Sequence, residues 1–252
     1  MKGVRPGRAA ADTVLAVAIL ASGWKLASVA VGLEIILPPP EKVLYTLYDV
    51  SLSPAFARAL VATSLRGLAA FAISMAAGIL VGLVNGVSVR ATTLSAPALT
   101  VIRATPVLAI ILLALIWFPS GVVPVFSAVV MAFPVVVADV ATGIRSADPS
   151  LVGMARSFGM DRLAILRHVR MPSALPYVMS AARNAMGLSW KVVVAGEVLS
   201  QPTHAVGTGM QNARLMLETT EVFAWAAVGV LLCALSDAAF SLLERKLQWS
   251  AN

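Results

Sequence analysis

The chain has 252 residues, of which 59% are hydrophobic and only 12% are charged, and its formal net charge is +7. Soluble domains carry about 25% charged residues, so this chain has too few ionisable side chains to cover a surface that faces water. Its basic residues lie between apolar runs and form no single patch with interleaved aromatic residues, which argues against a nucleic-acid partner. The composition therefore predicts an all-α membrane protein, and its lone Cys233 excludes an intrachain disulfide.

Several apolar runs reach the length of about 20 residues that a helix needs to cross a bilayer. The first follows a basic N-terminus without a clear cleavage site, which indicates an uncleaved helix and not a signal peptide. We expect one membrane domain over residues 1–252. Its six predicted spans cover approximately residues 12–33, 59–84, 96–118, 122–143, 175–199 and 222–243.

Proline and glycine mark the breaks between these spans. Residues 38–40 are three prolines that end the first span, and the apolar spacing over 41–50 predicts a short amphipathic helix at the membrane interface. Asn85-Gly86 predicts a turn after the second span, and residues 118–121 predict a tight turn after the third. Pro106 lies inside the third span and predicts a kink or a discontinuity there.

Basic residues concentrate on one side of the six-span arrangement. Lys42, Arg58 and Arg214 fall on the other side. The positive-inside rule therefore places both termini and the polar stretch 145–172 in the cytoplasm. The basic residues on that side are Lys2, Arg5, Arg8, Arg90, Arg145, Arg156, Arg162, Arg167, Arg170, Arg245 and Lys246.

The polar stretch contains two short helical pieces. Asp148 and Pro149 predict a helix start, with the aspartate as N-cap and the proline at the first helical position. Gly159 permits a left-handed break, after which apolar residues recur at helical spacing up to Pro172. A helix–Gly–helix that projects from a membrane bundle suits docking to a soluble partner, and an ordinary amphipathic loop is the alternative.

This stretch resembles the cytoplasmic loop of binding-protein-dependent ABC permeases. The signature of that loop is Glu-Ala-Ala, three residues, Gly, nine residues, Ile, one residue, Leu-Pro, and Ala155, Gly159, Val169 and Pro172 stand at matching positions. Gly153-Met154 replace the usual Glu-Ala, so the acid of the signature is missing. The resemblance implies docking to an ATPase through Gly153, Met154, Ala155, Arg156, Gly159, Met160, Asp161, Arg162 and Pro172.

Other segments resemble the nitrate, sulfonate and taurine branch of the same family. They include Ile36–Pro40, Thr63–Arg66, Arg103–Pro106 and Ser189-Trp190. The resemblance implies a type I importer fold in a bacterial inner membrane and a permease dimer, most simply a homodimer. It also implies two ATPase subunits, which would bind ATP and Mg²⁺ in place of this chain, and an extracytoplasmic substrate-binding protein.

Ionisable residues inside the spans predict where a solute passes, because burying a charge in hydrocarbon is costly. Five residues of span five lie within about 40° of one helical line, and Lys191 flanks that stripe. Arg103 adds a cation in span three. The predicted pathway residues are therefore Arg103, Arg183, Gly187, Trp190, Lys191, Val194 and Glu197.

Structural roles are the alternative for Arg103, Arg183 and Glu197 and, less strongly, for Lys191. Arg183 and Glu197 are near span ends and can extend to opposite membrane surfaces. Arg103 can pair with Asp139 or cap carbonyl groups freed at the Pro106 break. Lys191 lies deeper, and together with Arg103 it favours an anionic solute.

The sequence has no phosphate-binding loop of the Gly-x4-Gly-Lys-Ser/Thr type and no supported nucleophile–base pair, so we expect no catalysis in this chain. His168 and His204 fall on opposite sides of the predicted membrane, which excludes a shared metal site. An ABC importer permease is the preferred function. A stand-alone secondary transporter or channel is the alternative, but it leaves the glycine-broken loop unexplained.

Overall fold

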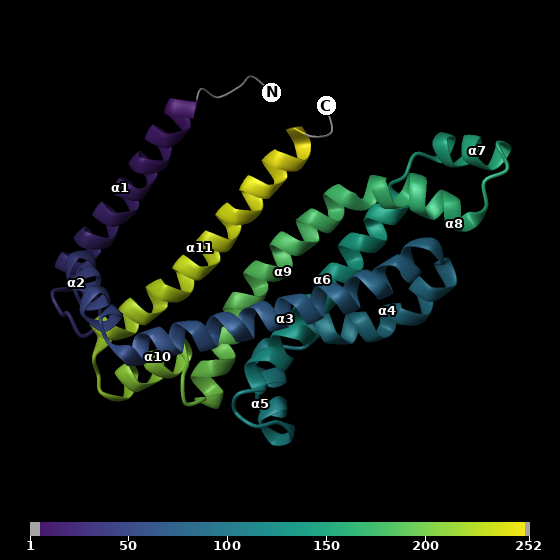
Figure 1. The fold of residues 1–252 in the computed structure, drawn as a ribbon. Helices are drawn as coiled ribbons and strands as arrows, with labels where there is room; N and C mark the ends of the chain where they lie inside the picture. The colour runs from purple at the N-terminus through teal and green to yellow at the C-terminus, as the bar shows by residue number, and fades with distance from the viewer. Residues whose placement is uncertain (1–5, 250–252) are drawn as a thin grey trace.

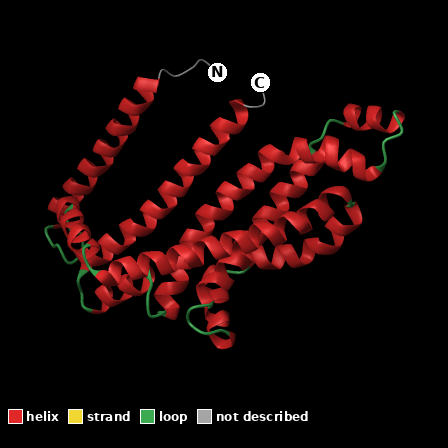
Figure 2. Ribbon diagram, viewed as in Figure 1, coloured by secondary structure: helices red, strands yellow, loops and turns green. Residues whose placement is uncertain are grey.

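The computed structural model describes residues 6–249, and all regular structure in that part of the chain is helical (Figures 1 and 2). Lys2 and Arg5, which contribute to the predicted orientation, lie outside the described residues. The helices are α1 (Pro6–Val31), α2 (Pro40–Ser51), α3 (Pro54–Val87), α4 (Val89–Ala104), α5 (Val107–Trp117), α6 (Val123–Arg145), α7 (Pro149–Ser157), α8 (Arg162–Ile165), α9 (Met171–Ser200), α10 (Val206–Leu215) and α11 (Thr219–Trp249).

The centre of the fold is formed by α3, α6 and α9, which pack closely along their lengths (Figure 1). Gly78, Gly82 and Gly86 recur every four residues on the face of α3 that meets α6. A Cβ atom on any of them would lie 2.5 to 2.7 Å from a branched side chain of α6. Small residues therefore set the close approach of these helices, as membrane helices require when no hydrophobic force drives them together.

The predicted turn at Asn85-Gly86 is wrong, because α3 continues to Val87. Gly86 is needed there for packing and not for a turn, since its missing Cβ leaves room for Ile144 of α6. The turn lies at Ser88. Its side-chain oxygen accepts a hydrogen bond of 3.2 Å from the backbone N–H of Ala91, which caps the start of α4.

Four helical segments are long and apolar enough to cross a membrane: Asp12–Val31, Pro54–Val87, Val123–Arg145 and Thr219–Leu242. The pair α4 and α5 meets the same standard as one broken segment, so five of the six predicted spans have such a counterpart. The remaining predicted span, the fifth along the chain, corresponds to α9, which has 30 residues but is less apolar. Its length suits a span, and its polar residues belong to the site described below.

The discontinuity predicted at Pro106 is confirmed, and it is larger than a kink. The axes of α4 and α5 differ by 96° across Thr105 and Pro106. Proline has no N–H to continue the helical hydrogen bonds of α4, so the chain turns and α5 begins afresh at Val107. The tight turn predicted over residues 118–121 is also present, with a 2.9 Å bond from the Val122 N–H to the Pro119 carbonyl.

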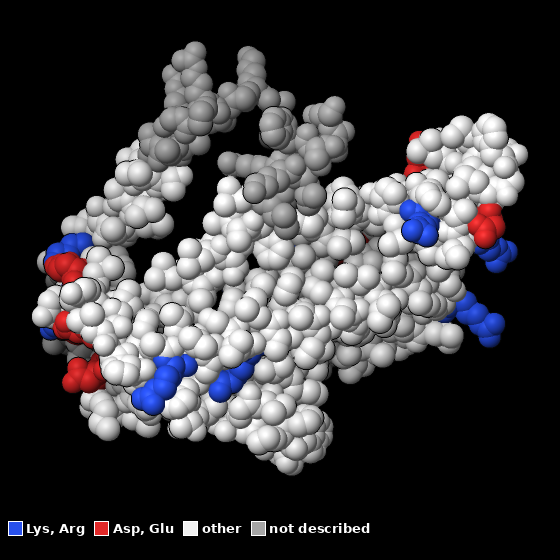
Figure 3. Space-filling model, viewed as in Figure 1, with Lys and Arg blue, Asp and Glu red and all other residues white. Residues whose placement is uncertain are grey.

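The short helix predicted over residues 41–50 is confirmed as α2, which packs against the first part of α11. Trp24 of α1 joins this end by donating a 3.0 Å hydrogen bond to the Pro38 carbonyl and by stacking on Phe223 of α11, with ring centroids 5.8 Å apart. Figure 3 shows charged side chains mostly toward the two ends of the visible face, with a wide uncharged surface between them.

Candidate functional site

The loop between α6 and α9 begins with a capped helix, as predicted. Asp148 is the N-cap of α7, and its carboxylate accepts a 2.8 Å hydrogen bond from the Ser150 N–H, with Pro149 in the first helical turn. Hydrogen bonds from the Ser150 hydroxyl and backbone hold the pKa of the Asp148 carboxyl below its usual range. The cap is therefore charged at neutral pH and stabilises the positive end of α7.

Gly159 ends α7 in the left-handed conformation, with φ of +79°. Its N–H donates to the Arg156 carbonyl at 2.9 Å and the Met160 N–H donates to the Ala155 carbonyl at 3.0 Å, which is the Schellman pattern. Asp161 then caps α8 by accepting a 2.7 Å hydrogen bond from the Ala164 N–H. The predicted helix–Gly–helix is confirmed, and its shape is set by local hydrogen bonds.

The two short helices are held together by a small apolar core, and other apolar side chains face outward. Ala155 is only 5% exposed and packs in this core, so it positions α7 against α8 instead of meeting a partner. Gly153, Met154, Arg156, Gly159, Asp161 and Arg162 are exposed. So are Leu151, Phe158 and Leu163, which the signature does not include.

The sequence predicted a second short helical piece that ends at Pro172, separate from the following span. In the structure this piece is joined to the span without a break. A π-helical turn (Leu166–Arg170) continues directly into α9, and Pro172 lies in the first turn of that helix. Proline removes one helical hydrogen bond there, and a local π-helical adjustment of the kind that precedes it allows a helix to continue past such a residue. Pro172 is exposed but belongs to the start of α9 and not to the projecting tip.

Gly159→Ala is expected to impair the loop, whereas Gly153→Ala is expected to leave it intact. A Cβ meets nothing within 4 Å at either position, so the two variants differ mainly in backbone conformation. Only Gly159 has a positive φ, which costs an L-residue about 1–2 kcal/mol. Limited proteolysis of the loop measures the difference. Equal cleavage of both variants would contradict the assigned role of Gly159.

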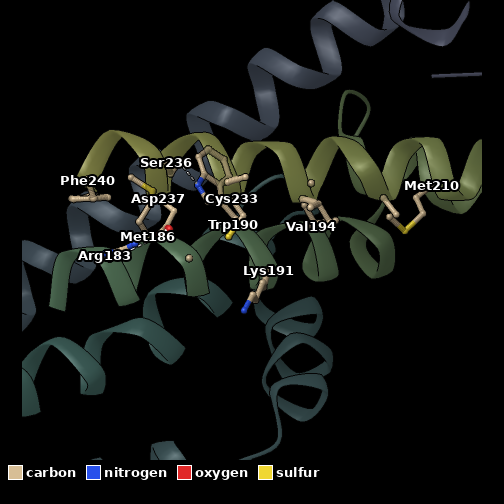
Figure 4. A pocket seen from close by; sticks show the side chains of 15 residues that line it. Arg183, Met186, Trp190, Lys191, Val194, Met210, Cys233, Ser236, Asp237 and Phe240 are labelled. Carbon is tan, nitrogen blue, oxygen red and sulfur yellow. Dashed lines mark hydrogen bonds and ion pairs between the residues drawn. The ribbon is translucent and has the colours of Figure 1, made fainter. Parts of the chain in front are cut away.

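A hollow of about 570 Å³ lies between α9 and α11 and is open on one side. It brings together five of the seven predicted pathway residues: Arg183, Gly187, Trp190, Lys191 and Val194. Figure 4 shows α11 facing them with Cys233, Ser236, Asp237 and Phe240, and Met210 of α10 at one end. The helical stripe read from the sequence is therefore one wall of a real hollow.

Two polar contacts join the walls of this hollow. Arg183 of α9 forms an ion pair with Asp237 of α11, including a 2.8 Å bond from Nη2 to Oδ2. Trp190 donates from Nε1 to the Ser236 hydroxyl at 2.8 Å. Asp237 was missed at the sequence level, although a carboxylate inside an apolar run signals a buried partner.

Lys191 differs from Arg183 because it forms no ion pair within the described part of the chain. Its side chain is exposed at the edge of the hollow, and Figure 4 shows its ammonium group pointing away from α11. An unpaired cation beside a mainly apolar hollow can attract an anion. An ion pair with a neighbouring helix accounts for the presence of Arg183 in a membrane span. No such ion pair accounts for Lys191 among the described residues.

Glu197 does not line the hollow, unlike the other five residues of span five that were predicted for the pathway. Its side chain is 0% exposed and forms an ion pair of 2.8 Å with Arg66 of α3. The same carboxylate accepts hydrogen bonds from the Thr63 hydroxyl at 2.9 Å and from the Gly207 N–H at 3.1 Å. The helical line was correct in angle, but Glu197 is one turn beyond the hollow and faces α3.

The cluster of Thr63, Arg66 and Glu197 caps the N-terminus of α10 with side chains from other helices. The α10 N-cap, Ala205, has no side chain able to accept a hydrogen bond, and Thr63 instead accepts one of 3.0 Å from the Val206 N–H. Glu197 accepts from the next N–H, so a carboxylate lies at the positive end of the helix. Arg66 also donates to the His204 carbonyl at 2.9 Å. The cluster fixes α10 and its connecting loop to α3 and α9.

Arg103 is also engaged in the structure, although not as expected. It donates from Nη2 to the Pro134 carbonyl of α6 at 2.6 Å, and it forms no ion pair with Asp139. The accepting carbonyl belongs to the neighbouring helix and not to the Pro106 break. Arg103 lies on α4 and does not line the hollow between α9 and α11 that Lys191 borders.

Comparison with known proteins agrees with this architecture. SsuC of Escherichia coli (strain K12), named as an aliphatic sulfonates transport permease protein, is 34% identical over 231 residues, covering 90% of this chain and 87% of its own. The taurine transport system permease protein TauC of the same organism is 28% identical over 235 residues, covering 91% and 85%. The nitrate import permease protein NrtB of Leptolyngbya laminosa is 30% identical over 154 residues, covering 59% and 53%.

Solved structures confirm the fold predicted from the resemblance. A chain of an amino acid ABC transporter superposes with a TM-score of 0.68 at 21% identity, covering 79% of this chain and 97% of that one. A chain of the MetNI methionine ABC transporter in an inward-facing conformation gives 0.64 at 17% identity, covering 76% and 95%. The sequence pattern of the binding-protein-dependent transport system inner membrane component matches residues 74–249. The chain belongs to this family of ABC importer permeases.

Proposed function

We propose that this chain passes a small anion or small organic molecule across a bacterial inner membrane by alternating access. An external binding protein would deliver the solute, and two separate ATPase subunits would supply the energy. The observation that carries the proposal is the projecting loop, in which α7 and α8 are fixed by caps and a left-handed glycine while apolar side chains stay exposed. A loop that only joined two spans would have no need for such an outward apolar surface.

The docking surface of the proposal consists of Leu151, Met154, Phe158 and Leu163, the exposed apolar residues of α7, its C-cap and α8. Phe158 is 81% exposed at the glycine break. Aromatic residues often dominate the binding energy of an interface when they enter a pocket of the partner. The basic residues Arg156 and Arg162 flank the surface and favour a partner groove with acidic edges.

Phe158→Ala is expected to weaken the association of the permease with its ATPase by about thirtyfold, the size of a hot-spot loss of about 2 kcal/mol. Met216→Ala is the matched control, because Met216 is a similarly exposed apolar residue in the connection between α10 and α11. Binding of purified permease to the ATPase measures both variants. Unchanged binding by Phe158→Ala would show that the ATPase docks elsewhere.

The orientation and assembly follow from the same proposal. The loop faces the cytoplasm, where the ATPases are, which places both termini on that side as the basic residues predict. One docking loop per chain and two ATPases per assembly require two permease copies, most simply a homodimer. A mass measurement of the purified complex that gave one permease per two ATPases would contradict this arrangement.

The substrate class is supported by Lys191 and by the relatives. SsuC, TauC and NrtB are named for aliphatic sulfonates, taurine and nitrate, which all carry an anionic group. Lys191, without an acidic partner among the described residues, offers a positive charge beside the hollow. A small anion or a small organic solute with an anionic group therefore suits the chain best.

A further inference from the structure

A second hollow, of about 480 Å³, lies at the base of the projecting loop and is separate from the one between α9 and α11. Four elements meet there: the end of α3, the start of α4, the end of α6 and the π-helical turn before α9. Its lining is largely polar at one side and includes two arginines. The residues that form it are Asn85, Gly86, Val87, Val89, Thr92, Thr93, Ile144, Arg145, Ala147 and Arg170.

The charge of this hollow is not balanced by the protein. Arg145 donates only to neutral acceptors, the Asn85 carbonyl at 3.2 Å and the Thr92 hydroxyl at 3.4 Å. Neither Arg145 nor Arg170 forms an ion pair among the described residues, and no carboxylate lines the hollow. The start of α4 adds the positive end of a 16-residue helix, and the carbonyl groups at the ends of α3 and α6 offset only part of the positive charge of the two arginines. These groups together are complementary to a singly or doubly charged oxyanion.

The rim of the hollow is apolar, which favours a lipid over a free ion as the ligand. Val87 and Val89 line it and are 48% and 84% exposed, and Leu94 on the next turn of α4 is 73% exposed. Such side chains face hydrocarbon favourably while the arginines and threonines meet a polar headgroup. Figure 3 shows several basic side chains, together with acidic ones, at the end of the molecule that carries α4, α7 and α8.

We propose that this hollow binds the phosphate-bearing headgroup of an anionic membrane lipid. The inference rests on the orientation in the proposed function, which puts this end at the cytoplasmic surface, where basic pockets between helices select anionic lipids. Ala147 directly precedes the projecting loop and Arg170 directly follows it, so a phosphate held by Arg145 and Arg170 links both ends of the loop to the turn between α3 and α4. The lipid thereby steadies the base on which the docking helices stand.

Association of spin-labelled phosphatidylglycerol with the full-length permease in phosphatidylcholine nanodiscs tests the site. Spin-labelled phosphatidylcholine measures the association that does not depend on headgroup charge. The preference for phosphatidylglycerol is expected to fall by about fivefold in Arg145→Gln and in Arg170→Gln, and by about 25-fold when both are changed. Arg90→Gln and Arg167→Gln are matched controls, because both arginines are exposed at the same end but do not line the hollow.

Four results would overturn the proposal. An unchanged preference in the double variant would show that no lipid binds there. An equal loss in the two controls would indicate attraction by diffuse surface charge. Displacement of the labelled lipid by inorganic phosphate, or weaker ATPase binding with unaltered lipid preference, would assign the arginines to a free anion or to an acidic partner surface. Because lipid association needs neither ATP nor substrate, a failure of the proposed transport function would leave this test intact.

Discussion

Glu197→Ala is expected to destabilise the folded permease by about 3–5 kcal/mol, the usual cost of removing one partner from a buried ion pair. Arg66 would lose its only carboxylate partner among the described residues. The Thr63 hydroxyl and the Gly207 N–H would lose hydrogen bonds of 2.9 and 3.1 Å at buried positions, which is costlier than at a surface. The loop that carries α10 would then detach from α3 and α9. A lower thermal unfolding midpoint of the purified protein in detergent measures this effect.

Asp237→Asn is the matched control, because it removes the carboxylate of a more exposed pair whose side chains are 38% and 53% exposed. Because this pair is less buried than Glu197 and Arg66, the midpoint should fall less than in Glu197→Ala. Glu197→Gln keeps the size and one acceptor oxygen and should fall between the two. If Glu197→Ala reduced uptake without lowering the midpoint, the carboxylate would belong to the transport route after all.

Lys191→Met is expected to reduce uptake about tenfold, which corresponds to about 1.4 kcal/mol on the transport barrier. Methionine keeps a similar length and removes the charge that faces away from α11 at the edge of the hollow. Lys191 has no ion pair among the described residues that its loss would break, so insertion and ATPase binding should be preserved. Uptake of a labelled anionic solute and recovery of the assembled complex are measured on the same preparation.

Lys42→Met is the control for a general effect of surface charge. Lys42 is an exposed lysine near the start of α2 and is paired with Glu34, far from the hollow in sequence and on a different helix. Its replacement should leave uptake near the wild-type rate. Loss of assembly in Lys191→Met would assign the lysine a structural role, and normal uptake would place it away from the solute.

Local features of the fold could be predicted from the sequence because they depend on single residue types. Pro106 separates α4 from α5, Asp148 and Pro149 start α7, and Gly159 takes the left-handed conformation, as predicted, although Pro97, Pro134 and Pro176 lie inside helices without ending them. The turn predicted at Asn85-Gly86 is absent because that prediction depended on a neighbouring helix. A glycine favours a turn only when no neighbouring helix requires its missing Cβ, and Ile144 of α6 requires it here.

Partnerships between distant helices could not be predicted from periodicity. The stripe on α9 grouped Arg183 with Gly187, Trp190 and Val194, which line one hollow, because residues on one helical face share their surroundings. Periodicity gives the direction of a side chain but not the element it meets. Glu197 therefore met Arg66 of α3, and Arg183 met Asp237 of α11, across separations of 131 and 54 residues. Arg66 and Asp237 are recognisable in the sequence as charged residues within apolar runs. The residues with which they pair depend on how the helices pack.

ATP-dependent uptake in sealed proteoliposomes tests the central claim most directly. The vesicles contain this permease with its two ATPase subunits, and a loaded binding protein is added on the side opposite to the ATPases. Labelled anionic solute should accumulate only when ATP is present on the ATPase side, and Phe158→Ala should reduce this accumulation while the permease stays in the membrane. Accumulation by the permease alone, driven by an ion gradient without ATPase or ATP, would contradict the account and identify a secondary transporter.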